Sequence, residues 1–327
     1  MTSYFDATAV RGRKRMQNEK QKRESQTDGR RSRLQMRCPL AIVVGSCLIL
    51  APGAAYSGDV RQLTQTGRVK FAPVFVRDGQ EIAWCEHDQP NRVSIVRLDL
   101  QTGKTTTMFP DDSSHRFDPA FSSDGRYFCF GRSGGSRQLS LVIVDLKANT
   151  KAVFEPPGGL RATIRTPRFI PRGDRVLFTI NGTGGQQIAS VDLKAQDYRK
   201  VTESSGINGW PDVSRNGKQI VFSSSRGGTL DLYLMKIDGS GVRRLTDHRL
   251  RDVRPAFSPD GSRIAFTSAR DGNDEIYLIT GDGSGLTRLT KHAERDDYPV
   301  WHPDGRQVAW IAERNGRFDL YLMPVEE

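Results

Sequence analysis

The chain has 327 residues, of which 36% are hydrophobic and 8% aromatic, and its formal net charge is +11. This apolar content is enough for a sizeable core and excludes wholesale disorder. Four cysteines without a C-x-x-C pair exclude a disulfide-stapled scaffold and a cysteine zinc site.

The first 37 residues form a basic leader that holds seven of the eleven net positive charges. The stretch has no apolar periodicity, so we expect residues 1–37 to be disordered. The remaining 290 residues are nearly balanced in charge. Nucleic-acid binding needs the basic excess on the folded surface, and we therefore predict no nucleic-acid partner.

Residues 38–57 follow the leader with the pattern of a secretory signal peptide. An apolar run at 38–50 is followed by small residues, and Gly53 and Ala55 suit the −3 and −1 positions of a cleavage site before Tyr56. The run is shorter than the roughly 20 residues of a membrane span. We predict a periplasmic or otherwise exported protein, which is membrane-anchored only if this leader stays uncleaved.

Residues 58–327 contain a sequence repeat marked by prolines that recur every 44 to 48 residues: Pro73, Pro119, Pro167, Pro211, Pro255 and Pro299. Each proline is followed six residues later by a glycine: Gly79, Gly125, Gly173, Gly217, Gly261 and Gly305. Four of these glycines follow Asp and one follows Asn, which predicts tight hairpins. The third copy reads Arg-Gly-Asp and is degenerate.

The segment after each glycine is apolar at consecutive positions, as in IAW, FCF, VLF, IVF, IAF and VAW. Such a strand is buried on both faces, which happens when sheets pack side by side. A third strand and a short fourth strand ending in Leu-Thr complete each copy. The pattern predicts an all-β, six-bladed propeller of four-stranded blades. The last copy stops at its third strand, so we expect 60–64 (VRQLT) to close the ring beside 319–323.

The repeated string Leu-Thr…Pro-x-Phe/Trp-Ser-Pro-Asp-Gly…Ile-Ala-Phe-x-Ser…Asp-x-Tyr-Leu resembles the TolB-type, WD-like β-propeller repeat. The resemblance covers about 59–327 and is strongest in copies four to six. It implies an exported propeller of the cell envelope with a protein partner, such as a Tol-Pal-like lipoprotein. TolB carries an α/β domain before its propeller, whereas here the signal segment runs directly into the first strand.

Residues just before each proline enter the innermost strand, so we expect them to converge on the mouth of the central channel. Their mixture of aromatic, arginine and carboxylate side chains is typical of binding hot spots. The predicted partner-binding residues are Arg116, Asp118, Asn208, Trp210, Asp252, Arg254, Asp296 and Tyr298. We predict a monomeric, non-catalytic interaction platform. The alternatives are a lyase or hydrolase acting on an envelope polymer, and a small-ligand or carbohydrate sensor that stacks sugars on Trp210 and Tyr298.

Other motifs predict no catalytic residue, metal site or cofactor. The G-x-S-x-G match at 131–135 lacks the helix of a nucleophile elbow and is interpreted as a hairpin turn. His248 and His292 occupy the same repeat position, which favours a structural loop role. Cys129 stands where other copies have Ala, Leu or Val and is predicted to be a buried small hydrophobe. Whether Cys85 approaches Cys129 from the neighbouring blade stays open.

Overall fold

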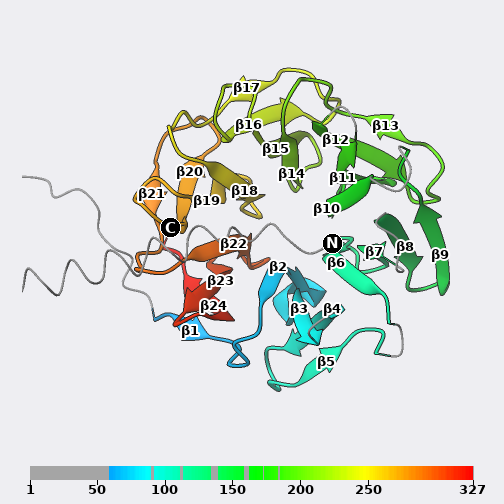
Figure 1. The fold of residues 1–327 in the computed structure, drawn as a ribbon, viewed down its shortest axis with the longest axis horizontal. Coiled ribbons are helices and arrows are strands. Elements are labelled where there is room, and N and C mark those ends of the chain that lie inside the picture. Colours follow the sequence, from blue (N-terminus) through cyan, green and yellow to red (C-terminus); the bar gives the residue numbers. More distant parts are fainter. Residues whose placement is uncertain are drawn as a thin grey trace, which may run out of the picture. The chain divides into compact units, whose positions relative to one another are not determined.

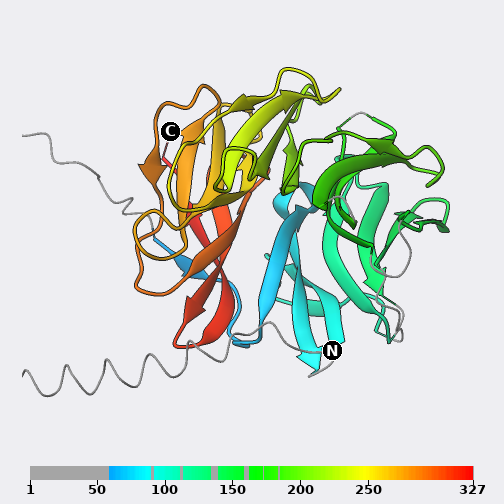
Figure 2. The same cartoon turned by 45° about the horizontal axis from the view of Figure 1, so that its top comes forward.

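The computed structural model describes residues 59–89, 92–110, 113–133, 139–157, 162–171, 173–182 and 185–326. The predicted leader at 1–37 and signal segment at 38–57 lie outside these ranges. The described residues form six antiparallel four-stranded sheets arranged around one axis, as Figures 1 and 2 show. The prediction of a six-bladed all-β propeller is confirmed. The blades are numbered one to six in the chain order of their innermost strands.

Within each sheet the strands run from the channel outwards in nearly sequential order. The innermost strands are β2 (Lys70–Val76), β6 (His115–Phe121), β10 (Thr163–Phe169), β14 (Asn208–Val213), β18 (Asp252–Phe257) and β22 (Asp296–Trp301). The second strands are β3 (Glu81–Gln89), β7 (Tyr127–Ser133), β11 (Arg175–Gly182), β15 (Gln219–Ser224), β19 (Arg263–Ser268) and β23 (Gln307–Arg314).

The third strands are β4 (Arg92–Asp99), β8 (Ser140–Asp145), β12 (Gly185–Asp192), β16 (Asp231–Lys236), β20 (Glu275–Thr280) and β24 (Arg317–Pro324). The outermost strands are short: β5 (Thr105–Thr107), β9 (Thr150–Phe154), β13 (Arg199–Lys200), β17 (Arg243–Arg244), β21 (Thr287–Arg288) and β1 (Arg61–Gln62). A 3-10 turn, η1 (Arg77–Gly79), joins β2 to β3. In the blade numbering, β2–β5 form blade one and β22–β24 with β1 form blade six.

The core lies between the blades, with a hydrophobic cluster at each of the six interfaces between neighbours. The second strands supply side chains to both of their faces. Ile82 and Trp84, for example, pack towards blade six, while Ala83 and Cys85 pack towards blade two. This double burial is what the consecutive apolar residues predict. Five of the six turn glycines adopt φ between +67° and +89°, and the degenerate Gly173 does not.

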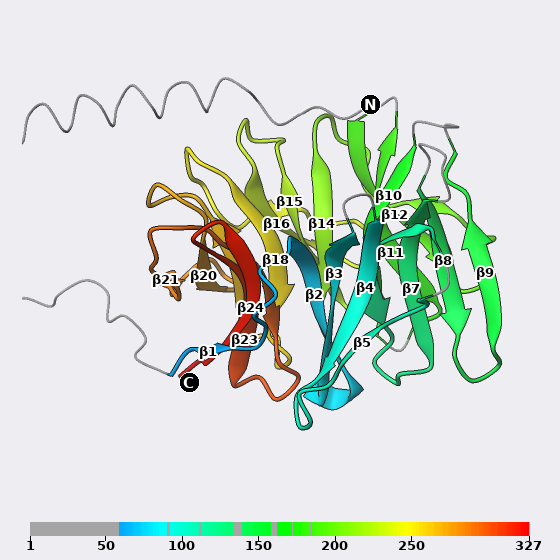
Figure 3. The same ribbon diagram turned by 60° about the horizontal axis from the view of Figure 1, so that its bottom comes forward.

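The N-terminal strand β1 completes the sixth blade, as predicted for 60–64. Arg61 and Gln62 pair with Leu322 and Tyr321 of β24, and the Leu63 N–H donates to the Leu320 carbonyl at 2.7 Å. Figure 3 shows β1 alongside β24. The first and last strands of the propeller therefore share one sheet, and the ring is closed by main-chain hydrogen bonds.

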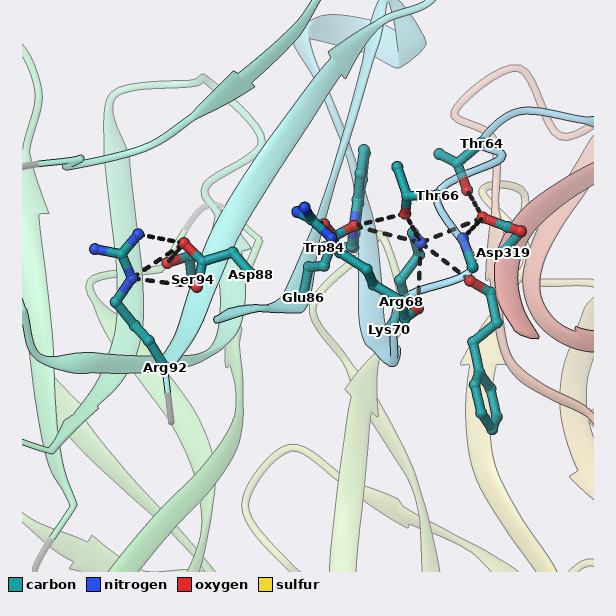
Figure 4. A network of polar contacts seen from close by, with 12 residues as sticks. Thr64, Thr66, Arg68, Lys70, Trp84, Glu86, Asp88, Arg92, Ser94 and Asp319 are labelled. Carbon is teal, nitrogen blue, oxygen red and sulfur yellow. Dashed lines mark hydrogen bonds and ion pairs between the residues drawn. The ribbon is translucent and has the colours of Figure 1, made fainter. Parts of the chain in front are cut away.

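A buried polar network strengthens this closure (Figure 4). The Lys70 side chain is 0% exposed, and its Nζ lies 3.3 Å from Glu86 Oε2 and 3.2 Å from Asp319 Oδ1. Thr64 Oγ1 donates to the same Asp319 oxygen at 2.8 Å. Lys70 and Glu86 belong to blade one, Asp319 to β24, and Thr64 to the closing segment. The network thus joins blade one to both halves of the shared sheet.

The Leu-Thr endings at 245–246 and 289–290 have a related structural role. A buried threonine donates to the carboxylate that starts the third strand, from Thr246 to Asp231 at 3.4 Å and from Thr290 to Glu275 at 2.6 Å. The same hydroxyl accepts the N–H of the residue after that carboxylate. Buried polar groups are costly unless they are hydrogen-bonded, so each threonine satisfies two of them at once.

Candidate functional site at the channel mouth

The residue before each of the six repeat prolines adopts a left-handed conformation, with φ between 50° and 59°. These residues are Ala72, Asp118, Thr166, Trp210, Arg254 and Tyr298. Each lies where the pairing of the innermost strand with the second strand shifts register. Side chains with a Cβ rarely adopt this conformation outside such local features. The propeller therefore has one bulge per blade, at the wall of the channel.

Four of the eight predicted residues come together at this bulge ring. Asp118, Trp210, Arg254 and Tyr298 line one cavity of about 230 Å³, with Arg165 and the other lining residues Thr163, Thr166, Thr179, Asn181 and Gln186. The same four residues also border a smaller cavity together with four of the six repeat prolines, Pro73, Pro211, Pro255 and Pro299. The expected convergence of these side chains on the channel is therefore present.

The other four predicted residues do not reach the mouth. The exposed fraction is 0% or 1% for each of Arg116, Asn208, Asp252 and Asp296. Asp252 pairs with Arg270 at 2.9 Å, and Asp296 pairs with Arg314 at 2.8 Å, within their own blades. In a regular strand, residues two apart share a face. The left-handed residue interrupts that alternation, so residues three and one before the proline point differently. Partner binding by any of the eight stays a prediction.

An ion pair that the sequence did not reveal fixes one side of the cavity. Arg165 Nε lies 2.5 Å from Asp118 Oδ2, which also accepts the Thr166 N–H at 2.9 Å. Burial alone would raise the pKa of Asp118, but the adjacent Arg165 charge outweighs it and holds the pKa below its usual value. The carboxylate is therefore ionised at neutral pH and orients the guanidinium.

A second ion pair fixes the opposite side. Arg254 Nη1 lies 3.1 Å from Asp297 Oδ1, and Arg295 pairs with the other carboxylate oxygen. Arg254 Nη2 also donates to the Tyr298 hydroxyl at 3.3 Å. Burial favours the neutral form of Asp297, yet the two guanidiniums lower its pKa overall. Burial raises the pKa of Tyr298, so its hydroxyl stays protonated at neutral pH.

These guanidiniums lie against aromatic rings at and beside the mouth. Arg254 Cζ lies 4.1 Å from the centroid of the Tyr298 ring and 5.5 Å from that of Trp210. Arg165 Cζ lies 5.3 Å from the centroid of the Phe117 ring. Cation–π contacts of this kind stabilise both partners. The mouth therefore presents guanidiniums that lie over one face of these rings.

Arg165 and Asp297 share one repeat position, two residues before the proline. The other copies have apolar residues or glycine there: Phe71, Phe117, Gly209 and Val253. An alignment of the six copies at this position would have singled out the two charged residues. The predicted residues come from the first and third positions before the proline, and so these two charged residues are not among them.

The remaining motifs have structural surroundings. The main-chain N–H groups of His248 and His292 donate to the carboxylates of Asp231 and Glu275, which fits the predicted loop role. Cys129 is fully buried, as predicted. Cys85 and Cys129 are both buried free thiols.

Within the G-x-S-x-G match, Ser133 ends β7, and the next described strand, β8, pairs antiparallel with β7. Residues 134–138 lie outside the described ranges. Among the described residues, no group of three or more His, Cys, Asp or Glu side chains is placed to hold a metal ion. In the same ranges no helix has the length and apolar character of a membrane span.

Several solved structures share this architecture. A TolB protein of Acinetobacter baumannii is 23% identical with a TM-score of 0.63, over 76% of this chain and 64% of that one. A TolB of Agrobacterium tumefaciens is 24% identical with a TM-score of 0.59, over 67% and 77%. An oligogalacturonate lyase of Vibrio parahaemolyticus is 15% identical with a TM-score of 0.55, over 84% and 96%. At these identities the likeness shows the fold alone.

A family profile described as the TolB beta propeller domain matches residues 119–253 and 248–327. The matches run from the second blade to the end of the chain and cover well over half of it. They include the copies in which the repeated string is clearest. The chain therefore belongs to the TolB β-propeller domain family.

Proposed function

We propose that the protein is an exported, non-catalytic propeller of the cell envelope that binds a protein or peptide partner at the channel mouth. The cavity shared by Asp118, Trp210, Arg254 and Tyr298 carries this proposal. Arginine and large aromatic residues dominate binding energy when they are packed and pre-positioned. The buried carboxylates hold the arginines in place, so little side-chain entropy is lost when a partner binds.

The ionisation state of the mouth supports a binding role over a catalytic one. A general acid or base works best when its pKa lies near the operating pH. The pKa values of Asp118 and Asp297 are instead lowered, and each carboxylate is engaged with a guanidinium. Both carboxylates therefore act as fixed supports for the arginines, which suits recognition without proton transfer.

Membership of the TolB propeller family supports export, and the signal-like segment gives a sharp test. We expect the mature protein to begin at Tyr56 and to fractionate with the periplasm. N-terminal sequencing of the protein from fractionated cells measures both. A protein that retains residues 38–55 and sediments with membranes would make the leader an anchor, and a cytosolic, full-length protein would contradict export.

Site-specific photocrosslinking in the native cells tests partner binding. A photoreactive side chain at Asn181, which is exposed at the mouth, should give a discrete adduct. The matched control places the same group at Lys194, which is also exposed and lines a different cavity. Asn181 pairs with Gln186 near the start of β12, whereas Lys194 follows the end of β12 at Asp192. An adduct from the mouth alone supports the proposal. Equal adducts from both positions, or no adduct from the mouth, would contradict specific binding of the partner at the channel mouth.

A further inference from the structure

The mouth has more positive than negative charge on one side. Arg251 pairs with Asp274 at 2.6 Å, and Asp274 lies 3.3 Å from Arg295 Nε. Arg295 in turn shares Asp297 with Arg254. Three guanidiniums thus surround two carboxylates in one connected chain of ion pairs. The cluster therefore carries one net positive charge, and its member Arg254 lines the cavity.

The opposite wall leaves a donor for a ligand. The pair between Arg165 and Asp118 uses Nε and Nη2 of the guanidinium and does not use Nη1. Asn181 and Gln186, which line the same cavity, supply side-chain amides beside it. Guanidinium and amide N–H groups together match the oxygens of a carboxylate, and charge-assisted hydrogen bonds of this kind are the stronger class.

Two features distinguish a carboxylate from a neutral sugar as the occupant. Sugar rings stack on open aromatic faces, but Arg254 already covers a face of Tyr298 and approaches Trp210. The cavity of about 230 Å³ is also below the roughly 300–1,000 Å³ of sites that enclose a whole small molecule. It therefore suits one or two side chains that project from a longer segment.

We propose that the partner segment is an acidic peptide whose Asp or Glu carboxylate enters this cavity between Arg165 and Arg254. This inference rests on the proposed partner-binding function and names the chemistry that the partner presents. The pre-positioned arginines give the recognition its specificity, because each is held by a buried aspartate and can use only its remaining N–H groups. The charge surplus adds attraction that salt weakens.

Random peptides displayed on phage and selected against the purified full chain provide the probe. We expect the enriched sequences to be acidic. The best peptide is then labelled with a fluorophore, and its Kd is measured by anisotropy beside a version with Asn and Gln in place of Asp and Glu. The amide version should bind about 10- to 100-fold more weakly, which is the scale of a charge-assisted hydrogen bond.

Variants of the protein locate the contact. Arg165→Gln combined with Asp118→Asn removes both charges and leaves no buried carboxylate unpaired, and it should weaken the acidic peptide by the same about 10- to 100-fold. Arg254→Gln is the second variant, because Arg295 still pairs with Asp297. The matched control is Arg126→Gln, which removes one exposed charge beside Asp145, away from the mouth.

Enriched neutral or basic peptides, or equal Kd values for the acidic peptide and its amide version, would overturn the inference. The inference would also be overturned if an oligogalacturonate bound more tightly than the acidic peptide and this binding were lost in the same mouth variants. That result would favour an acidic polysaccharide as the ligand. The photocrosslink at Asn181 separates the two levels. If the adduct forms but acidic peptides are not preferred, only the carboxylate chemistry is refuted. If there is neither an adduct at Asn181 nor a preference for acidic peptides, the proposed partner binding at the mouth is refuted as well.

Discussion

Replacing Lys70 by methionine removes the charge at the centre of the closure network and should destabilise the propeller. The ammonium group contacts Glu86 and Asp319 and donates to Thr66 Oγ1 at 2.6 Å and to the Phe318 carbonyl at 3.0 Å. Removing one partner of a buried ion pair lowers the free energy of unfolding by about 3–5 kcal/mol, because the remaining charge is left uncompensated.

The lower end of that range applies here, because both carboxylates keep other donors. Asp319 retains the Thr64 hydroxyl, and Glu86 retains the Trp84 indole N–H at 3.1 Å. We therefore expect Lys70→Met to reduce the free energy of unfolding by about 3 kcal/mol. For a domain of this size, the melting temperature should fall by roughly 6–12 °C.

The control is Arg68→Met, which removes a different cation from the same glutamate. Arg68 lies 3.1 Å from Glu86, but its side chain is 53% exposed, so the loss should be about 1 kcal/mol or less. Urea unfolding followed by tryptophan fluorescence measures both variants. If Lys70→Met cost no more than Arg68→Met, the buried network would not contribute to closure, and the reasoning from burial would be refuted.

Three further changes test the closure, the repeated threonine and the mouth. Deleting 60–64 should cause aggregation or loss of cooperative unfolding, whereas unchanged melting would contradict closure by β1. Thr246→Val, which keeps the shape but removes the hydrogen bond to Asp231, should cost about 1–3 kcal/mol in urea unfolding. The pKa of Asp118 is lower in the folded protein than in the unfolded chain, where an aspartate has a pKa of about 4. The ionised Asp118 therefore stabilises the fold above about pH 4, and this contribution is lost as the pH falls. Burial raises the pKa of Asp212, so its contribution has the opposite sign and is lost as the pH rises. Asp118→Asn should therefore cost more than Asp212→Asn at pH 7, and urea titrations towards pH 3 should show this difference shrinking.

The fold was predictable because the same pattern of strands and turns occurs in six copies of the sequence repeat. The proline and glycine spacing locates the turn between the first and second strands of each copy, and the apolar pattern of the second strand predicts burial on both faces. The incomplete last copy leaves 60–64 as the missing fourth strand, and the structure pairs it with β24. Each of these inferences depends on local sequence and on the number of copies, both of which are visible without coordinates.

The mouth was only half predictable because it depends on the bulge. Without the left-handed residue, strand alternation would place Asn208 and Trp210 on one face. With it, Asn208 is fully buried and accepts hydrogen bonds from Ser224 and Arg226, whereas Trp210 lines the cavity. A left-handed tryptophan is uncommon, and periodicity alone does not predict it. The burial of half the predicted residues follows from that single backbone feature.

The bulge also explains why the ion pairs cross between blades. It turns the residue before the proline towards the next blade, where it meets the residue two before that blade's proline. Asp118 meets Arg165 in this way between blades two and three, and Arg254 meets Asp297 between blades five and six. These two interfaces lie opposite each other in the ring, and the order of the charges is reversed between them. The ion pairs therefore hold an arginine at each of two separated places on the mouth. The same two positions, compared in other propellers with this bulge, should predict which of their blades are joined by charge.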